Sequence, residues 1–403
     1  METVKKTKKK KWLRFRHRVV TWLLSGPLGA YTRWKYGLQV EPFRQQGKRP
    51  YLILLNHQTA FDQFFVGLAF RGPVYYVASE DLFSNGWVSS LIRYLVAPIP
   101  IKKQTTDANA VMTCIRVARE GGTIAIAPEG NRTYSGKTEY MSPAVAPLAR
   151  KLKLPIALFR IQGGYGVQPR WSDGVRKGCV RAYVSRVIEP EEYDKLTNSQ
   201  LFALIRDELY VNEAVADQRF VSDKKAEYLE RAMYVCPFCG LSEFESSGDE
   251  IACKQCGAVI RYNEDKTLTG KDKAFPFRFV NDWYEYQASY INGLDVLRHT
   301  EKPLYRETIR LIEVAPYKKK YVLQKSTTVE LYGDRIKLGG LELPFKELEA
   351  VTVLGRNKLN IYCRWNLFQL QGGKRFNALK YVHIFHRHRN IIRGEEHGEF
   401  LGI

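Results

Sequence analysis

Residues 51–62, YLILLNHQTAFD, contain the pattern on which the fold of this chain depends. The run YLILLN (51–56) is short, continuously apolar and ends at polar residues, which is typical of a buried strand. The stretch that follows, TAFDQFFVGLAF (59–70), has a helical pattern of apolar residues. A buried strand that leads directly into a helix indicates a sheet covered by helices.

The same alternation continues for about one hundred residues. Further buried strands are predicted at VYYVA (74–78), APIPI (97–101), TIAIA (123–127) and LPIALFRI (154–161). Between them, TDANAVMTCIRVAREGG (106–122) is typical of a helix, with Cys114 on its apolar face. We therefore expect an α/β sandwich with a largely central sheet.

Two polar residues, His57 and Asp62, stand where the first strand gives way to the helix. On an unbroken helix a spacing of five residues would turn their side chains apart, so they meet only if His57 lies at the helix entrance. A carboxylate that holds one imidazole nitrogen makes the other a better proton acceptor. This is the pair of groups needed to activate a hydroxyl.

A second group of polar residues follows the strand at 123–127, in APEGNRTYSGKT (127–138). The stretch is close to a nucleotide P-loop, but five residues rather than four separate Gly130 from Gly136. A P-loop also needs a sustained helix after it, and Pro143 comes too soon. What remains is a strand end, a glycine and Arg132, whose planar guanidinium can bind a phosphate through two nitrogens.

Together, NHQTAFD (56–62) and PEGNRT (128–133) resemble the H-x4-D and PEG-x-R signatures of the glycerolipid acyltransferase family, in the same order and at about the same distance. The lysophosphatidic acid acyltransferases are the most similar branch. IPIKK (99–103) and LPI (154–156) correspond to two weaker family blocks. The resemblance implies that His57 and Asp62 are the catalytic pair.

The resemblance also implies a site for the phosphate of the acceptor. Its predicted residues are Lys102, Lys103, Glu129, Gly130, Asn131 and Arg132. Asn131, Lys102 and Lys103 differ from the residues usual in the family. The implied reaction transfers a fatty acyl group from acyl-CoA or acyl carrier protein to 1-acylglycerol-3-phosphate. Another lysophospholipid or glycerol-3-phosphate is the alternative acceptor.

Four of the seven cysteines have metal-ligand spacing. CPFCG (236–240) and CKQCG (253–257) each present two thiolates from one turn, which predicts a zinc ribbon with the ligands Cys236, Cys239, Cys253 and Cys256. Because cysteine fills all four positions, we expect the zinc to be structural. Two disulfides are the alternative interpretation.

The chain carries 63 Lys and Arg against 42 Asp and Glu, a formal net charge of +21. Cations and aromatic residues mix near the N-terminus, as in an interfacial anchor, which predicts a peripheral or monotopic protein on an anionic membrane, at the cytoplasmic face. A solvated basic tail before an ordinary core helix is the alternative. A zinc-ribbon protein that binds nucleic acid would explain the charge but not the acyltransferase motifs, so no nucleic-acid partner is expected.

The predicted organisation has four parts. Membrane-anchoring helices occupy 1–45, an acyltransferase domain 46–225, the zinc ribbon 226–275 and a β-rich domain 276–403. In the last part, short strands between two helices resemble a small barrel of the pleckstrin-homology (PH) or GRAM type. His383, His386 and His388 lie among arginines in its closing helix, which predicts a solvated basic face.

Overall fold

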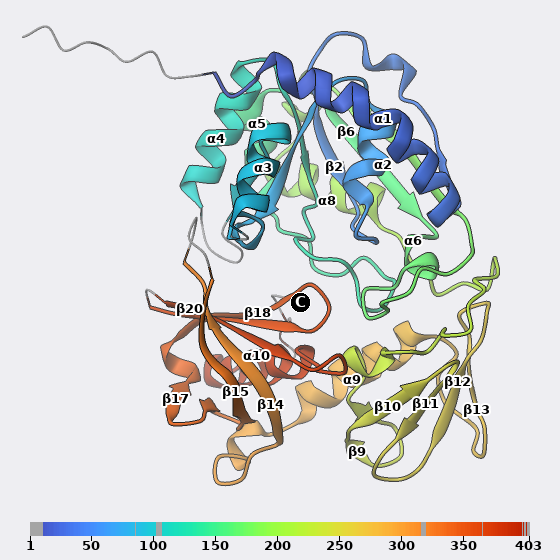
Figure 1. The fold of residues 1–403 in the computed structure, drawn as a ribbon, viewed down its shortest axis with the longest axis vertical. Coiled ribbons are helices and arrows are strands. Elements are labelled where there is room, and N and C mark those ends of the chain that lie inside the picture. The colour runs from blue at the N-terminus through green and yellow to red at the C-terminus, as the bar shows by residue number, and fades with distance from the viewer. Residues whose placement is uncertain are drawn as a thin grey trace, which may run out of the picture.

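The first sheet has seven strands in the order β1-β7-β6-β2-β5-β3-β4 (Figure 1). The structure is a computed structural model that describes residues 11–84, 86–101, 107–315, 320–364, 366–396, 398 and 400. The strands are β1 (Leu38–Val40), β2 (Leu52–Leu55), β3 (Val74–Ser79), β4 (Ile99–Ile101), β5 (Thr123–Ile126), β6 (Ile156–Gln162) and β7 (Val180–Ile188). Strands β6, β2, β5, β3 and β4 run parallel, and β7 runs antiparallel to β6.

Helices cover both faces of this sheet. They are α1 (Phe15–Tyr36), α2 (Asp62–Ala69), α3 (Trp87–Val96), α4 (Ala108–Arg119), α5 (Val145–Leu152), α6 (Gly164–Val167), α7 (Pro190–Tyr193) and α8 (Asn198–Leu209). Within β2, Ile53 and Leu55 pack with residues of α1 and α2, and Leu52 and Leu54 with residues of α4, α5 and α8. Because successive side chains of a strand point to opposite faces, the continuous apolar run fills both layers. The mixed α/β sandwich expected from the sequence is confirmed.

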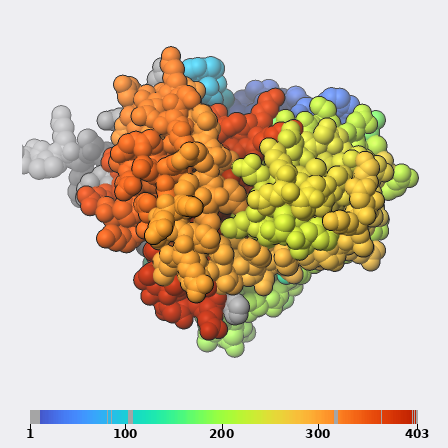
Figure 2. All heavy atoms as spheres, turned by 90° about the horizontal axis from the view of Figure 1, so that it is seen from below, coloured from blue at the N-terminus to red at the C-terminus, as the bar shows by residue number. Residues whose placement is uncertain are grey.

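A cysteine-containing module follows. It has a two-stranded ribbon of β8 (Val235–Cys236) and β9 (Gly240–Leu241), and a four-stranded antiparallel sheet of β10 (Phe244–Ser247), β11 (Glu250–Cys253), β12 (Val259–Tyr262) and β13 (Leu268–Gly270). Helix α9 (Val280–Gly293) leads from this module to the last sheet. Figure 2 shows the module in yellow-green beside the orange residues of that sheet.

The last sheet is antiparallel and curled, with seven strands in the order β17-β16-β15-β14-β20-β19-β18. Its strands are β14 (Tyr305–Glu313), β15 (Tyr321–Leu331), β16 (Arg335–Leu338), β17 (Leu341–Pro344), β18 (Leu348–Leu354), β19 (Lys358–Cys363) and β20 (Asn366–Gly372), and helix α10 (Leu379–Arg393) follows. Its core is continuous with that of the cysteine module. The PH or GRAM identity remains a prediction.

Helix α10 corrects one expectation. His383 and His386 are buried, not solvated. His383 Nδ1 lies 2.5 Å from Tyr234 Oη, and burial together with nearby His386 lowers the pKa of His383 to about 3. The sequence suggested a basic face because arginines alternate with the histidines, but the ring of His383 lies 6.0 Å from that of Tyr284 in α9, and half-buried His388 lies 5.3 Å from Phe345.

Helix α1 lies across the part of the chain that holds the first sheet, and it packs against α2 and α3. It buries His17, Gly29, Thr32 and Tyr36 and exposes aromatic residues on its other side. Across the described residues, no helix is both long and apolar enough to span a bilayer.

Candidate active site

The loops that follow β2 and β5 meet at one edge of the first sheet. Because these strands are parallel neighbours, both loops leave at their carboxyl ends. The main-chain N–H of His57 donates to Glu129 Oε1 at 2.9 Å, and the N–H of Thr133 donates to the His57 carbonyl at 3.3 Å. The two sequence motifs are therefore in direct contact.

His57 and Asp62 form a hydrogen-bonded pair. His57 Nδ1 lies 2.8 Å from Asp62 Oδ2, and the side-chain exposures are 27% for His57 and 1% for Asp62. His57 precedes α2 and Asp62 is its first residue, which explains how a spacing of five brings them together. A carboxylate at Nδ1 favours the tautomer with the proton there, so Nε2 is left to accept a proton.

The carboxylate of Asp62 is held by more than the histidine. It accepts hydrogen bonds from the main-chain N–H of Gln58 at 2.7 Å, from that of Thr59 at 2.9 Å and from Thr59 Oγ1 at 2.6 Å. These donors surround the carboxylate at the N-terminus of α2, where the helix dipole also favours a negative charge. Asp62 is thus a fixed support for the imidazole.

Asn56, which the sequence analysis did not single out, anchors the histidine loop. Its amide donates to the Ile161 carbonyl at 2.8 Å and accepts from the Ile161 N–H at 2.8 Å. The pair ties the end of β2 to the end of β6. A polar amide at the end of a buried strand was the available signal, since a buried amide must find partners.

The guanidinium of Arg132, in the loop after β5, has one buried nitrogen, Nη1, without a hydrogen-bond partner among the described residues. Burial, with Arg170 and Arg356 nearby, lowers the pKa of Arg132 to about 10. An anion bound beside this guanidinium would satisfy the nitrogen and offset the repulsion between the arginines.

The other predicted phosphate-binding residues have different positions. Gly130 has a φ of +72° in the turn before Arg132, and a Cβ there would meet no atom within 4 Å. Asn131 is half-buried in the same loop. Glu129 joins the loop to His57, and burial raises the pKa of Glu129 to about 8. Lys102 and Lys103 lie outside the described residues.

The turn between β18 and β19 reaches this loop from the C-terminal sheet. Arg170, which is buried, donates to the carbonyls of Arg132 at 2.8 Å and Gly355 at 3.0 Å. Tyr134 Oη donates to the Arg356 carbonyl at 3.4 Å. Sequence reasoning missed both arginines because neither belongs to a local motif.

The nucleotide-loop alternative does not fit this geometry. Lys137 itself forms a β-bridge with Asn212, and the next helix, α5, begins only at Val145. The helix N-terminus that a P-loop directs at its phosphates is therefore missing from this described stretch.

The four cysteines of the two CxxC motifs converge. Their Sγ atoms lie within 4.8 Å of one another, with Cys236 to Cys256 at 3.7 Å and Cys239 to Cys253 at 3.6 Å. Tetrahedral Zn–S bonds of about 2.3 Å require sulfur atoms roughly 3.8 Å apart, so this set fits a metal ion. These separations exceed the S–S bond length of about 2.05 Å, so the thiols are not joined as disulfides.

Part of this chain is similar to known acyltransferases. A family model described as Acyltransferase matches residues 38–161. The 1-acyl-sn-glycerol-3-phosphate acyltransferase of Bacillus subtilis (strain 168) is 20% identical over 160 residues, which cover 40% of this chain and 77% of that enzyme. The chloroplastic enzyme BAT2 of the same name from Brassica napus is 21% identical over 151 residues, 36% of this chain and 43% of that enzyme.

Among solved structures, the 1-acyl-sn-glycerophosphate acyltransferase PlsC from Thermotoga maritima matches with 20% identity and a TM-score of 0.41, over 48% of this chain and 80% of that one. The chain spans less than half the length of the plant relative. Residues 38–161 thus match the Acyltransferase family model, and the relatives named above support the glycerolipid acyltransferase family for this part of the chain.

Proposed function

We propose that this protein is a membrane-associated acyltransferase that moves a fatty acyl group from a thioester to the free hydroxyl of 1-acylglycerol-3-phosphate. The product is phosphatidic acid, a precursor in phospholipid biosynthesis. The observation that carries the proposal is the His57–Asp62 pair at 2.8 Å beside the loop of Arg132. The names of the relatives support the same acceptor.

In the proposed reaction, His57 Nε2 removes the proton from the acceptor hydroxyl as its oxygen attacks the thioester carbonyl carbon. The tetrahedral intermediate then collapses, the carbon–sulfur bond breaks, and the imidazolium returns its proton to the leaving thiolate. Asp62 stabilises the imidazolium in between. No covalent acyl-enzyme is needed.

The acceptor's phosphate is proposed to bind at Arg132, with Gly130 and Asn131 allowing close approach of the loop, and with Lys102 and Lys103 contributing further positive charge. Coenzyme A and acyl carrier protein are both acidic donors, which suits a net charge of +21. The four cysteines hold a structural zinc, and the protein acts at the cytoplasmic face of a membrane. The domain boundaries at 45, 225 and 275 are part of the same proposal.

The test is steady-state kinetics with lysophosphatidic acid and a panel of thioesters. His57→Ala should lower kcat by about 10²- to 10⁴-fold with little change in the KM for the acceptor, because the lost group acts in proton transfer. Arg132→Ala should raise the acceptor KM by about 10- to 150-fold, because it removes charge-assisted hydrogen bonds.

Control experiments test whether Arg132 binds the phosphate of the acceptor. Arg181→Ala removes an exposed arginine of β7 and should leave both constants unchanged. For a monoacylglycerol acceptor, which has no phosphate, kcat/KM should be low with the wild type and scarcely lower with Arg132→Ala. If Arg132→Ala weakens thioester binding instead, this loop holds the donor. A panel with glycerol-3-phosphate and other lysophospholipids identifies the acceptor.

A further inference from the structure

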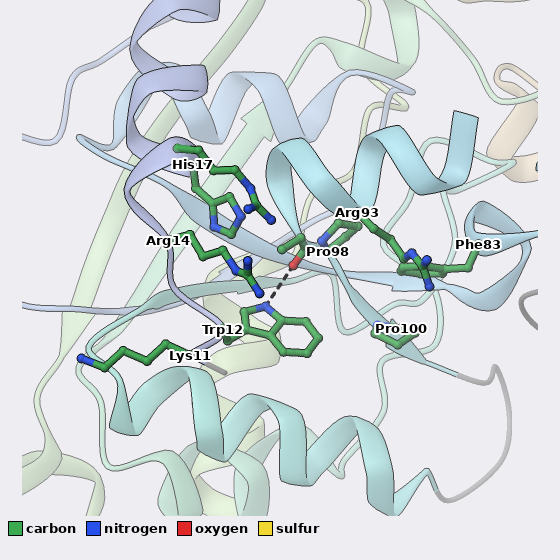
Figure 3. Close-up of a pocket in the computed structure, with 10 residues that line it drawn as sticks. Lys11, Trp12, Arg14, His17, Phe83, Arg93, Pro98 and Pro100 are labelled. Carbon is green, nitrogen blue, oxygen red and sulfur yellow. Dashed lines mark hydrogen bonds between the residues drawn. The ribbon is translucent and has the colours of Figure 1, made fainter. Parts of the chain in front are cut away.

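A basic cavity of about 260 Å³ lies beside the edge strand β4, away from the site described above. Its walls come from the segment before α1, the first turn of α1, the end of α3 and the residues that lead into β4 (Figure 3). Its lining includes neither His57 nor Arg132, and β4 is three places from β2 in the sheet. The cavity is therefore separate from the candidate active site.

The lining is strongly cationic. Lys11, Arg14, Arg16, His17 and Arg93 contribute to the lining, and no acidic residue stands among the described residues that line the cavity. Figure 3 shows His17, Arg14 and Trp12 along one side of the cavity and Arg93 and Phe83 along the other. Like charges that gather around a cavity favour an anionic occupant.

Hydrogen bonds hold the walls of the cavity together. The N–H groups of Trp12 and Leu13 donate to Glu120 Oε2 at 2.7 and 3.0 Å, and Trp12 Nε1 donates to the Ala97 carbonyl at 3.1 Å. Arg16 Nε donates to the Tyr94 carbonyl at 2.7 Å. The segment before α1 is thereby fixed to the ends of α3 and α4.

His17 supplies an independent sign of a ligand. His17 is 1% exposed, and its buried Nε2 makes no well-aligned hydrogen bond among the described residues, although the main chain of Tyr94 lies close to this ring. Its Nδ1 lies 3.1 Å from Tyr75 Oη. Burial raises the pKa of Tyr75 to about 12, so the tyrosine keeps its proton and can donate it to Nδ1. In that tautomer Nε2–H is a donor at the cavity wall.

The surface around the cavity indicates where an anion would come from. Phe15, between Arg14 and Arg16, is 79% exposed, and Trp87 of α3 is 76% exposed. Leu91 and Tyr94 of α3 are also exposed, and α1 and α3 pack together. Exposed aromatic and aliphatic side chains beside cations suit the boundary between lipid headgroups and acyl chains.

We propose that this cavity binds the phosphate group of an anionic phospholipid, with Arg14, His17 and Arg93 around the phosphate and Phe15 and Trp87 in the adjoining lipid. The site would hold one lipid in a defined orientation, which a diffuse basic surface does not do. It is independent of acyl transfer, because none of its residues belongs to the proposed catalytic machinery.

The test measures binding of monomeric dihexanoyl-phosphatidylglycerol, a phosphodiester that is not a product of the proposed reaction, to the full chain by calorimetry. Dihexanoyl-phosphatidylcholine and inorganic phosphate are the comparison ligands. We expect one phosphatidylglycerol per chain and binding of both comparison ligands about tenfold weaker or more. If inorganic phosphate binds as tightly as the lipid, the assignment to a lipid is wrong.

Matched variants locate the site. Arg14→Ala and Lys11→Ala are single variants that each remove one exposed cation of the cavity. Arg14→Ala should weaken phosphatidylglycerol binding about tenfold or more. Arg33→Ala removes the same charge from another exposed position of α1 and should change binding less than about twofold. Melting temperatures verify that each variant is folded.

Two results would overturn the proposal. Equal losses in Arg14→Ala and Arg33→Ala would show attraction by net charge alone. Loss of binding in Arg132→Ala, which should bind like the wild type, would place the lipid in the catalytic region.

Discussion

The buried guanidinium of Arg170 donates from Nη1 to the main-chain oxygen of Arg132 at 2.8 Å. Its Nε donates to the carbonyl of Gly355 at 3.0 Å, and the guanidinium lies over the Tyr134 ring, 4.2 Å from its centre. One side chain therefore connects the loop of the first half to the β18–β19 turn of the last sheet. The C-terminal sheet forms part of the surroundings of the candidate site.

Arg170→Met should weaken catalysis through this connection. Methionine keeps most of the volume but leaves carbonyls of Arg132 and Gly355 without their donor, so the loop loses its fixed position. We expect kcat/KM for the acceptor to fall by roughly 10- to 100-fold, as a small misplacement of a binding group does. Arg206→Met, an exposed arginine of α8, is the control. Unchanged kinetics for both variants would show that the connection is dispensable.

The raised pKa of Glu129 predicts that the stability of the protein depends on pH. The pKa of Glu129 is raised to about 8 by burial, above the ordinary value of about 4.3, so the folded state holds the proton more tightly than the unfolded chain. Raising the pH from about 4.5 to about 8 therefore costs the folded state stability, and the loss stops above pH 8.

Glu129→Gln, which mimics the protonated acid, should abolish the loss of stability between about pH 4.5 and pH 8. The melting temperature of the variant should rise relative to that of the wild type as the pH increases through this window. Glu191→Gln, at an exposed position of α7, should show no such trend. A difference between Glu129→Gln and the wild type that stays constant with pH would contradict the assignment.

Metal analysis tests the four cysteines. Purified protein should contain about one zinc per chain, and a strong chelator should lower the melting temperature, because a structural zinc site contributes directly to folding. Cys239→Ser should reproduce both effects, whereas Cys363→Ser, outside the cluster, should retain zinc. Stable, folded protein without metal would argue against the zinc ribbon.

Exposed tryptophans of α1 test the membrane contact. Trp22 and Trp34 are 74% and 78% exposed. The double substitution Trp22→Ser/Trp34→Ser should weaken binding to anionic vesicles at least about tenfold, because it removes a large apolar area from the proposed membrane interface. Tyr210→Ser, an exposed aromatic residue outside α1, is the control for cosedimentation. Deleting the whole helix is a poorer test, because Thr32 and Tyr36 are buried in the fold. Full vesicle binding by the double variant would place the membrane contact elsewhere.

The sequence predicted the parts of the site that depend on local pattern. The apolar runs before His57 and before Glu129 were predicted to be buried strands, and the structure places them side by side, which brings their loops to one edge. The Arg170 and Arg356 contacts were not predictable, because they depend on how a distant turn docks. His383 was misjudged for a similar reason, since only the packing of α10 decides which side of a mixed helix is solvated.

The contact between Tyr134 and Arg356 also has a consequence for how the protein is made. It joins residues 222 positions apart. At a synthesis rate of roughly 5–20 residues per second, the ribosome adds the β18–β19 turn roughly 10–40 seconds after the PEGNRT loop. During this interval the nascent first half of the chain carries His57 and Asp62 but lacks the β18–β19 turn to which Arg170 donates a hydrogen bond. The candidate site is complete only when the last sheet has been translated.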